Sequence, residues 1–277
     1  MTINCKGELV DLISPKVMGI LNLTPDSFFD GGKYKDESSI LTQVEYMLDQ
    51  GAAFIDMGAY SSRPGAEHVP EDEELQRMIP VIDLILKNFP DTLISVDTFR
   101  SKVAAESIEH GAAIINDIAA GNLDKNMFAT IAKHQVPYIM MHMKGTPQSM
   151  QKEATYDNLI NDLRFYFSEK IQEATSKKIN DVIIDPGFGF AKTTAQNYTL
   201  LHHLDMFQTL GLPILIGLSR KSMVYKILES SPQEALNGTT ALHTVALLKG
   251  ANIIRAHDVK EASECVKLVE ALKANAL

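Results

Sequence analysis

Eight short apolar runs recur along the chain, and each follows a turn and stops at or near a polar residue. Each run is roughly four to seven residues long and too apolar for a strand with one face in water. This pattern is typical of parallel strands that are buried on both faces. The runs lie within residues 17–27, 51–60, 92–100, 111–121, 136–145, 181–190, 211–221 and 250–259.

Segments with helical periodicity separate these runs. Leu75, Met78 and Ile82 recur at a spacing that places them on one helix face. Eight strands that alternate with helices, without a linker of biased composition, indicate a (β/α)₈ TIM barrel in a single domain over residues 1–277. An open, doubly wound α/β sheet is the alternative. Glycines stand where helices would be capped before the next strand, at positions 51, 111, 211 and 250.

The remaining segments have predicted places on such a barrel. Residues 1–15 are expected to form a short extra hairpin that caps the bottom of the barrel. Longer connections at 24–37, 60–71 and 144–156 follow the first, second and fifth strands. On this fold the loops after the strands lie over the active-site mouth.

Composition narrows the class of ligand. The chain has 26 Lys and Arg against 35 Asp and Glu, a net charge of −9, which argues against a nucleic-acid partner. An anionic ligand would therefore need a local cluster of basic groups. No apolar stretch is long enough for a membrane span, and the N-terminus lacks the pattern of a signal peptide. Cys5 and Cys265 show no metal-ligand spacing, so we expect free thiols and a cytoplasmic enzyme.

Polar side chains follow each of the eight predicted strands. A single polar strand end is unremarkable, because the chain is leaving the core there. Hydrogen-bonding or charged residues at all eight ends favour a ligand site at the mouth of the barrel. They are Asn22, the 61–63 loop, Asp97, Asn116, His142, Asp185, the 219–221 segment and the 255–257 segment.

Basic residues at three of these ends point to an anion. Arg63, Lys221 and the pair Arg255 and His257 would converge from distant parts of the sequence. Ser222 would open the next helix, whose free N–H groups also favour an anion. For Lys221 alone, a solvated helix start is an equally good interpretation.

Acidic and amide residues at other ends suit a planar heterocycle. Asp185 could accept two N–H bonds from one ring edge, and Asn116 could use both its donor and its acceptor there. Asp97 could offset a developing positive charge or act as a base. The alternatives are local: Asp185 could stabilise a turn, Asn116 or Asp117 could cap the next helix, and Asp97 could cap the helix that starts near Arg100.

Two further strand ends allow only weaker interpretations. Asn22 offers a neutral oxygen that could hold a phosphate-bound Mg²⁺ that keeps most of its waters. His142 is expected to be buried and hydrogen-bonded rather than catalytic, and the methionines around it to pack in the core.

Together the strand-end motifs closely resemble those of the dihydropteroate synthase family, folate-pathway enzymes that are inhibited by sulfonamides. They occur in order over nearly the whole chain, and NLTPDSFFDGG with DPGFGF and SRK is highly specific. The matching segments are MGILNLTPDSFFDGGKY (18–34), SSRPGAE (61–67), SVDTFR (95–100), INDIAAG (115–121), MHMKGTPQSMQ (141–151), IIDPGFGFAKT (183–193), GLSRKSM (217–223) and RAHDVKEA (255–262).

The resemblance implies that 6-hydroxymethyl-7,8-dihydropterin diphosphate reacts with 4-aminobenzoate to give 7,8-dihydropteroate and diphosphate. It implies Mg²⁺ at Asn22 and a homodimer formed through the outer helices. Catalysis would involve Asp97, Lys221 and Arg63. The pterin would be bound by Asp97, Asn116, Asp185 and Lys221, the diphosphate by Asn22, Ser62, Arg63, Arg255 and His257, and the aminobenzoate by Phe28, Ser62, Pro64, Gly189, Phe190, Ser219 and Ser222.

Three positions depart from the commonest family pattern. Ser62 stands where Thr is usual, Tyr60 where an acidic or amide residue is frequent, and Ala256 where Val is common. Ser62 keeps a hydroxyl, so its contact with substrate is retained in principle. The competing hypotheses are a pterin-binding methyltransferase barrel and a non-catalytic pterin- or folate-binding barrel. Neither accounts for the basic cluster together with the loops after the first two strands.

Overall fold

The computed structural model describes residues 1–23, 33–60 and 68–275, and within them eight parallel strands form a barrel. Neighbouring strands pair in the order β8-β7-β6-β5-β4-β3-β10-β9, and a parallel bridge between Ile184 and Ile214 joins the two ends. The predicted TIM barrel is therefore confirmed. The strands are β3 (Lys16–Asn22), β4 (Ala52–Gly58), β5 (Ile94–Asp97), β6 (Ile114–Asp117), β7 (Tyr138–Met141), β8 (Val182–Asp185), β9 (Leu215–Ile216) and β10 (Ile253–Ala256).

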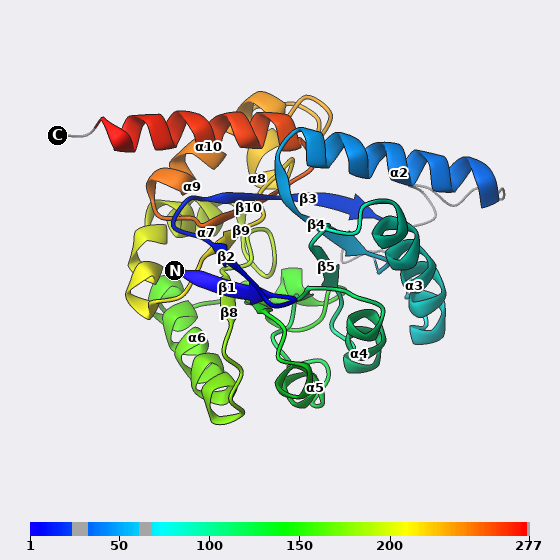
Figure 1. Cartoon of the computed structure of the whole chain (residues 1–277). Coiled ribbons are helices and arrows are strands. Elements are labelled where there is room, and N and C mark those ends of the chain that lie inside the picture. Colours follow the sequence, from blue (N-terminus) through cyan, green and yellow to red (C-terminus); the bar gives the residue numbers. More distant parts are fainter. Residues whose placement is uncertain (24–32, 61–67, 276–277) are drawn as a thin grey trace.

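Helices surround the strands (Figure 1). The glycines at 51, 111, 211 and 250 have positive φ angles of 96°, 101°, 70° and 95°, as expected where a helix ends before the next strand. The described helices are α2 (Lys33–Asp49), α3 (Glu71–Asn88), α4 (Ser101–Glu109), α5 (Met127–His134), α6 (Leu159–Ser176), α7 (Thr194–His202), α8 (Ser222–Tyr225), α9 (Leu236–Leu248) and α10 (Val259–Ala274), with 3₁₀ turns η1 (Met150–Glu153) and η2 (Leu204–Leu210).

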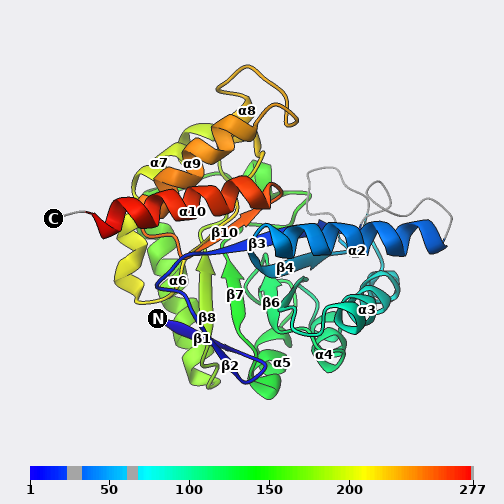
Figure 2. The same cartoon turned by 45° about the horizontal axis from the view of Figure 1, so that its top comes forward.

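The expected hairpin is present at the N-terminus. Strand β1 (Thr2–Cys5) pairs with β2 (Glu8–Asp11) in antiparallel fashion. Ile3, Cys5 and Leu12 are at most 1% exposed and pack on the first inward-facing side chains of the barrel. Figure 2 shows this hairpin at the end from which the barrel strands start, opposite their arrowheads. The barrel residues that it covers include Met18, Phe54, Ile114, Ile139, Ile183, Leu215 and Ile253.

The inward-facing side chains that the hairpin covers are apolar, whereas on four strands the next inward-facing side chain, two residues later, is polar. Side chains alternate in direction along a strand, so residues two apart point to the same side. Phe54 is thus followed by Asp56 on β4, and Ile253 by Arg255 on β10. In the same way, Asn116 follows Ile114 on β6, and Asp185 follows Ile183 on β8. The switch in polarity places the polar and charged side chains at the carboxyl end of the barrel.

Two of the three long connections lie largely outside the described residues, namely those at 24–37 and 60–71, whereas 144–156 contains η1. Among the helices that the structure describes, none combines the length and hydrophobicity that crossing a bilayer requires.

Candidate active site

Arg255 lies between two carboxylates inside the barrel mouth. Its Nε donates to Asp56 Oδ2 at 2.5 Å, and its Nη2 donates to Asp97 Oδ2 at 3.0 Å. The Asp56 side chain is completely buried, and that of Arg255 is 20% exposed. From its place at a strand end beside His257, Arg255 was expected on the anion side of the site. In the structure, its guanidinium also neutralises Asp56 and Asp97. These two residues, with Asn116 and Asp185, form the floor of the barrel mouth.

Asp56 is the functional candidate that sequence analysis missed. Besides Arg255, its carboxylate accepts hydrogen bonds from Ser95 Oγ at 2.6 Å and from Asn116 Nδ2 at 3.2 Å. A signal was present, since Asp56 is a carboxylate within the apolar run AAFIDMG of β4. Aspartate is almost never fully buried unless it is paired, so such a position calls for a partner.

The bond to Asp56 fixes how Asn116 presents its amide. Because Nδ2 is directed at the buried carboxylate, Oδ1 points away from it, and no residue that the structure describes donates a hydrogen bond to Oδ1. Asn116 does not cap the following segment. Asp117 does so instead, accepting the backbone N–H groups of Ala119 at 2.8 Å and Gly121 at 2.7 Å. Asn116 is therefore available to a ligand.

Asp97 is not a helix cap either. The first N–H of α4, on Ser101, donates to Asp124 Oδ2 at 2.7 Å. Burial raises the pKa of Asp97 to about 7; Arg255 opposes this rise, and repulsion from Asp56 adds to it. A carboxyl group whose pKa is shifted this far, beside a cation in the mouth of a barrel, is a strong candidate for chemistry.

Asp185 combines a local and a functional role. Its Oδ1 accepts the backbone N–H of Gly187 at 2.8 Å, so the turn-stabilising interpretation is correct for one oxygen. Its Oδ2 faces Gly217, where an added Cβ would lie 4.0 Å away. Burial raises the pKa of Asp185, while Lys221 and the bond from Gly187 oppose the rise.

Lys221 reaches inward rather than into solvent, so its interpretation as a solvated helix start is wrong. Its Nζ donates to the carbonyl of Phe188 at 2.5 Å and lies 4.6 Å from the centre of the Phe190 ring. Burial lowers the pKa of Lys221 to about 8, and Asp185 opposes the shift. Neighbouring Arg220 turns away and forms two 2.8 Å contacts with Asp258.

The helix that Ser222 opens is shorter than expected. Helix α8 has only four residues, Ser222–Tyr225, so few peptide dipoles are aligned there. Ser222 opens a helix as predicted, and the anion preference of its free N–H groups stays a prediction. Ser219 and His257 contact each other: the His257 N–H donates to Ser219 Oγ at 3.2 Å, and Oγ lies 3.1 Å from His257 Nδ1.

The other predicted site residues divide into two groups. Asn22 is half-buried at the carboxyl end of β3, and Gly189 and Phe190 are half-buried after β8. His142 is 3% exposed, as expected, and its partner is Lys192, a second buried residue that sequence analysis missed. The other group, Phe28, Ser62, Arg63 and Pro64, lies outside the described residues.

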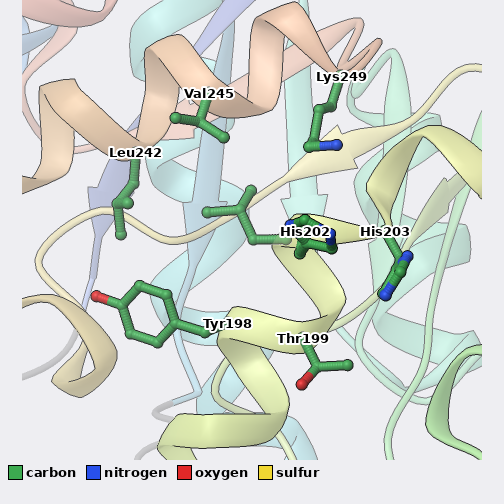
Figure 3. A pocket seen from close by; sticks show the side chains of 8 residues that line it. Tyr198, Thr199, His202, His203, Leu242, Val245 and Lys249 are labelled. Atoms are coloured by element: carbon green, nitrogen blue, oxygen red, sulfur yellow. The ribbon is translucent and has the colours of Figure 1, made fainter.

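Another hollow lies on the outside of the molecule, away from the barrel mouth. A groove of about 520 Å³ separates α7 from α9 on the outside of the barrel. Figure 3 shows Tyr198 and Thr199 on one side of it and Leu242 and Val245 on the other. The groove contains none of the strand-end carboxylates or cations, so the chemistry is assigned to the barrel mouth.

Comparison with known proteins agrees with this geometry. The model of the pterin binding enzyme family matches residues 18–257. Dihydropteroate synthase of Escherichia coli (strain K12) is 42% identical over 273 residues, which cover 98% of this chain and 96% of that protein. The chain belongs to the dihydropteroate synthase family of pterin-binding enzymes.

Solved structures of this family have the same fold. The dihydropteroate synthase of Yersinia pestis with a sulfonamide drug superposes with a TM-score of 0.92 at 42% identity, covering 99% of this chain and 100% of that one. The Thermus thermophilus enzyme in complex with 4-aminobenzoate has a TM-score of 0.88 at 34% identity, covering 98% and 100%. The fold of dihydropteroate synthases is thus retained from end to end.

Removing the Asp56 carboxylate should destabilise the fold. We expect Asp56→Ala to lower the free energy of unfolding by roughly 3–5 kcal/mol, because Arg255 loses a buried counter-ion. Asp56→Asn, which keeps one acceptor oxygen, should cost less. Urea denaturation of the purified variants measures both changes.

Asp83→Ala is the matched control, since Asp83 pairs with His110 while 56% of its side chain is exposed. An exposed pair contributes at most about 1 kcal/mol. Equal losses for Asp83→Ala and Asp56→Ala would contradict the role given to the buried carboxylate.

Proposed function

We propose that this chain condenses 6-hydroxymethyl-7,8-dihydropterin diphosphate with 4-aminobenzoate, forming 7,8-dihydropteroate and diphosphate in folate biosynthesis. The enzyme is a transferase of alkyl or aryl groups. The observation that carries the proposal is the barrel floor, where Asn116 and Asp185 offer acceptors beside the Arg255–Asp97 ion pair. Membership of the dihydropteroate synthase family supports the same reaction.

The pterin would lie on this floor. A pterin ring has N–H donors along one edge, which match Asn116 Oδ1 and the Asp185 carboxylate. Each charge-assisted hydrogen bond of this kind is worth roughly 1.5–3 kcal/mol. Lys221 would contact the ring from the other side. Gly217 leaves room for the ring, because its position lies next to both Arg255 and Asp185 and has no side chain.

The diphosphate would lie nearer the rim. Two carboxylates hold Arg255 through Nε and Nη2, so it would offer Nη1 to the diphosphate. His257 follows directly after the same strand, β10. Asn22 from β3, with Ser62 and Arg63 of the next loop, would complete this site. The negative charge that develops on the leaving oxygen would be spread over these groups.

Asn22 also fits a magnesium ion. Its side chain is half-buried and makes no hydrogen bond with any residue that the structure describes, so its oxygen is available. Nor do the described residues contain a cluster of three His, Cys, Asp or Glu that could hold a metal by themselves. Mg²⁺ commonly uses one or two protein oxygens together with substrate phosphates and water, which suits Asn22. When bound, Mg²⁺ would neutralise charge on the diphosphate.

The reaction would then begin by breaking the bond between the pterin methylene carbon and the diphosphate oxygen. The electron-rich dihydropterin shares the positive charge left on the methylene, and the Asp97 carboxylate offsets it. The amine of 4-aminobenzoate attacks this carbon and loses a proton as the new C–N bond forms. Because an aryl amine is a weak base, catalysis depends on position more than on a strong base.

The aminobenzoate would be held between the loops of the mouth. Gly189 and Phe190 after β8, with Ser219 and Ser222 after β9, would form one wall of its slot. Phe28, Ser62 and Pro64 are proposed for the other wall. Sulfonamides resemble this substrate, so the same slot would bind them.

The decisive experiment is a diphosphate-release assay with and without 4-aminobenzoate in the presence of Mg²⁺. Release should depend on both substrates and on the metal. Arg255→Ala should lower kcat/KM by at least about 10²-fold, because a preorganised donor to the leaving group is removed. Arg164→Ala, on α6 outside the barrel, is the control and should keep full activity.

Tight pterin binding without diphosphate release would point to the non-catalytic barrel. Methyl transfer to a corrinoid without diphosphate release would point to the methyltransferase.

The activity should depend on pH in a bell shape. Asp97 must be ionised to offset a cation, so kcat/KM should fall as the pH drops below its raised pKa of about 7. Lys221 must be protonated to donate, so activity should fall as the pH rises above its lowered pKa of about 8. Asp97→Asn should lower turnover and remove the acidic limb. Full turnover by this variant with an unchanged profile would contradict the role of Asp97.

We further propose a cytoplasmic homodimer, with no nucleic-acid or membrane partner. The cytoplasm agrees with two buried, free cysteines. The dimer surface is proposed on α9 and α10, which pack side by side and expose large apolar side chains. Leu248, Leu268 and Leu272 are 48%, 72% and 59% exposed there, and a second copy of this face would cover them.

Light scattering tests this surface through the molecular mass. We expect twice the chain mass for the unmodified protein and a single chain mass for the variant Leu268→Glu with Leu272→Glu. Leu9→Glu changes an equally exposed leucine on the far hairpin and should remain dimeric. A monomer in the unmodified protein would exclude the dimer.

A further inference from the structure

The segment between β8 and α7, residues 186–193, is held by an unusual set of hydrogen bonds. It has no helix or strand, yet most of it is buried. Buried carbonyl groups need partners, and here side chains supply them. Five consecutive carbonyls each accept a side-chain donor: Gly187 from Lys192 at 3.0 Å, Phe188 from Lys221 at 2.5 Å, Gly189 from Gln151 at 3.1 Å, Phe190 from Lys192 at 3.1 Å, and Ala191 from Tyr156 at 2.9 Å.

Lys192 makes two of these bonds and is itself only 3% exposed. Its third contact, at 3.1 Å, is with His142 Nδ1 at the end of β7. An ammonium group has three N–H donors and no acceptor, so the three acceptors match it completely. The Lys192 side chain therefore ties the loop at Gly187 and at Phe190 to the end of a neighbouring strand.

The burial and charges around this tether favour a neutral His142. To accept a hydrogen from Lys192, Nδ1 must carry none, so the ring proton lies on Nε2. Burial and the nearby Lys192 charge keep the pKa of His142 well below its usual value, in agreement with this form. Burial also lowers the pKa of Lys192 to about 7, and the Asp185 carboxylate opposes that change. The three hydrogen bonds favour the protonated amine.

The loop backbone would not hold this shape by itself. Gly187, Gly189 and Ala191 have φ angles of +74°, +81° and +48°, so every second residue is left-handed. For Ala191 this conformation costs roughly 1–2 kcal/mol. A Cβ at position 187 would lie 2.1 Å from the His142 carbonyl oxygen, which shows how closely the loop is pressed against β7. The contacts made by side chains must offset the strain.

We propose that Lys192 is a positioning residue, which holds residues 187–190 in the shape that receives 4-aminobenzoate. This inference rests on the proposed function, because Gly189 and Phe190 are assigned to the aminobenzoate slot there. Among the groups assigned to the pterin, Asn116 and Asp185 lie on strands that the barrel itself fixes. Lys221 contacts the loop at Phe188, and Asp185 accepts the N–H of Gly187. Among the described residues, the pterin site is hydrogen-bonded to the loop only through these two contacts. Loss of the tether should therefore affect the two substrates differently.

Lys192→Met tests the proposal, since methionine fills the space without donating hydrogen bonds. We expect the KM for 4-aminobenzoate to rise about tenfold or more, because a displaced loop misplaces its substrate. The KM for the dihydropterin diphosphate should change by less than about threefold, a small loss on the free-energy scale. Amide hydrogen exchange in residues 186–193 should become faster.

Tyr156→Phe is the matched control. It removes one hydrogen bond to the same loop, at Ala191, from a half-buried side chain whose place water can take. Both KM values should stay within about twofold of the unmodified enzyme. An equal rise of both KM values for Lys192→Met, or no rise in either, would overturn the positioning role. Unchanged hydrogen exchange in the loop would overturn the tether.

A second variant covers the case in which Lys192→Met does not fold. His142→Leu removes one of the three acceptors and leaves both carbonyl bonds in place, so a smaller change in the same direction is expected. No rise in the KM for 4-aminobenzoate would then overturn the role. If the unmodified protein itself released no diphosphate, the proposed function and the substrate assignment would fail. Hydrogen exchange would still decide whether Lys192 holds the loop.

Discussion

The site depends on one guanidinium group placed between two carboxylates inside the barrel. Arg255 joins β10 to β4 through Asp56 and to β5 through Asp97, so it links three strands. Asp56 in turn orients Asn116 on β6. A buried ion pair of this kind adds little net stability compared with apolar packing, but removing one member leaves an unpaired charge. The cluster therefore fixes how the floor residues are oriented and contributes little to the free energy of unfolding.

Polar groups could collect in the barrel only because its other end is apolar. The hairpin residues Ile3, Cys5 and Leu12 seal the first inward layer of the strands, and this layer contributes hydrophobic burial. The charged layer lies directly above it, and its Asp56, Asn116 and Asp185 side chains are buried. Desolvation consequently raises the pKa of Asp97 and lowers that of Lys221, and both shifts bring titration toward neutral pH.

Much of this architecture could be predicted from the sequence, because the periods of strands and of helices both appear in short stretches of sequence. Short apolar runs between glycine turns gave the eight strands, and the residue at each run's end gave the mouth. Asp56 and Lys192 were missed because their meaning depends on distant partners. Arg255 is 199 positions from Asp56, and His142 is 50 positions from Lys192. No local pattern shows that such residues will meet.

The dependence on distant partners also explains why the sequence left open whether Asp97 and Asn116 cap helices. Whether Asp97 caps a helix was decided by Asp124, which takes that place, and whether Asn116 does so was decided by Asp117. The helix start at Ser222 was predicted, but that α8 ends after one turn could not be read from the sequence. Capping and helix length depend on tertiary packing, which outweighs local propensity.

The hairpin at the bottom of the barrel also has a kinetic consequence. With that end covered, ligands of the floor must pass the rim at the carboxyl ends of the strands. Groups assigned to the pterin lie below those assigned to the aminobenzoate, because Asn116 and Asp185 end strands while Gly189 and Phe190 belong to the loop beyond. Both substrates and the product would therefore use the same entrance. The substrate assigned to the floor would then have to enter before the one assigned to the rim.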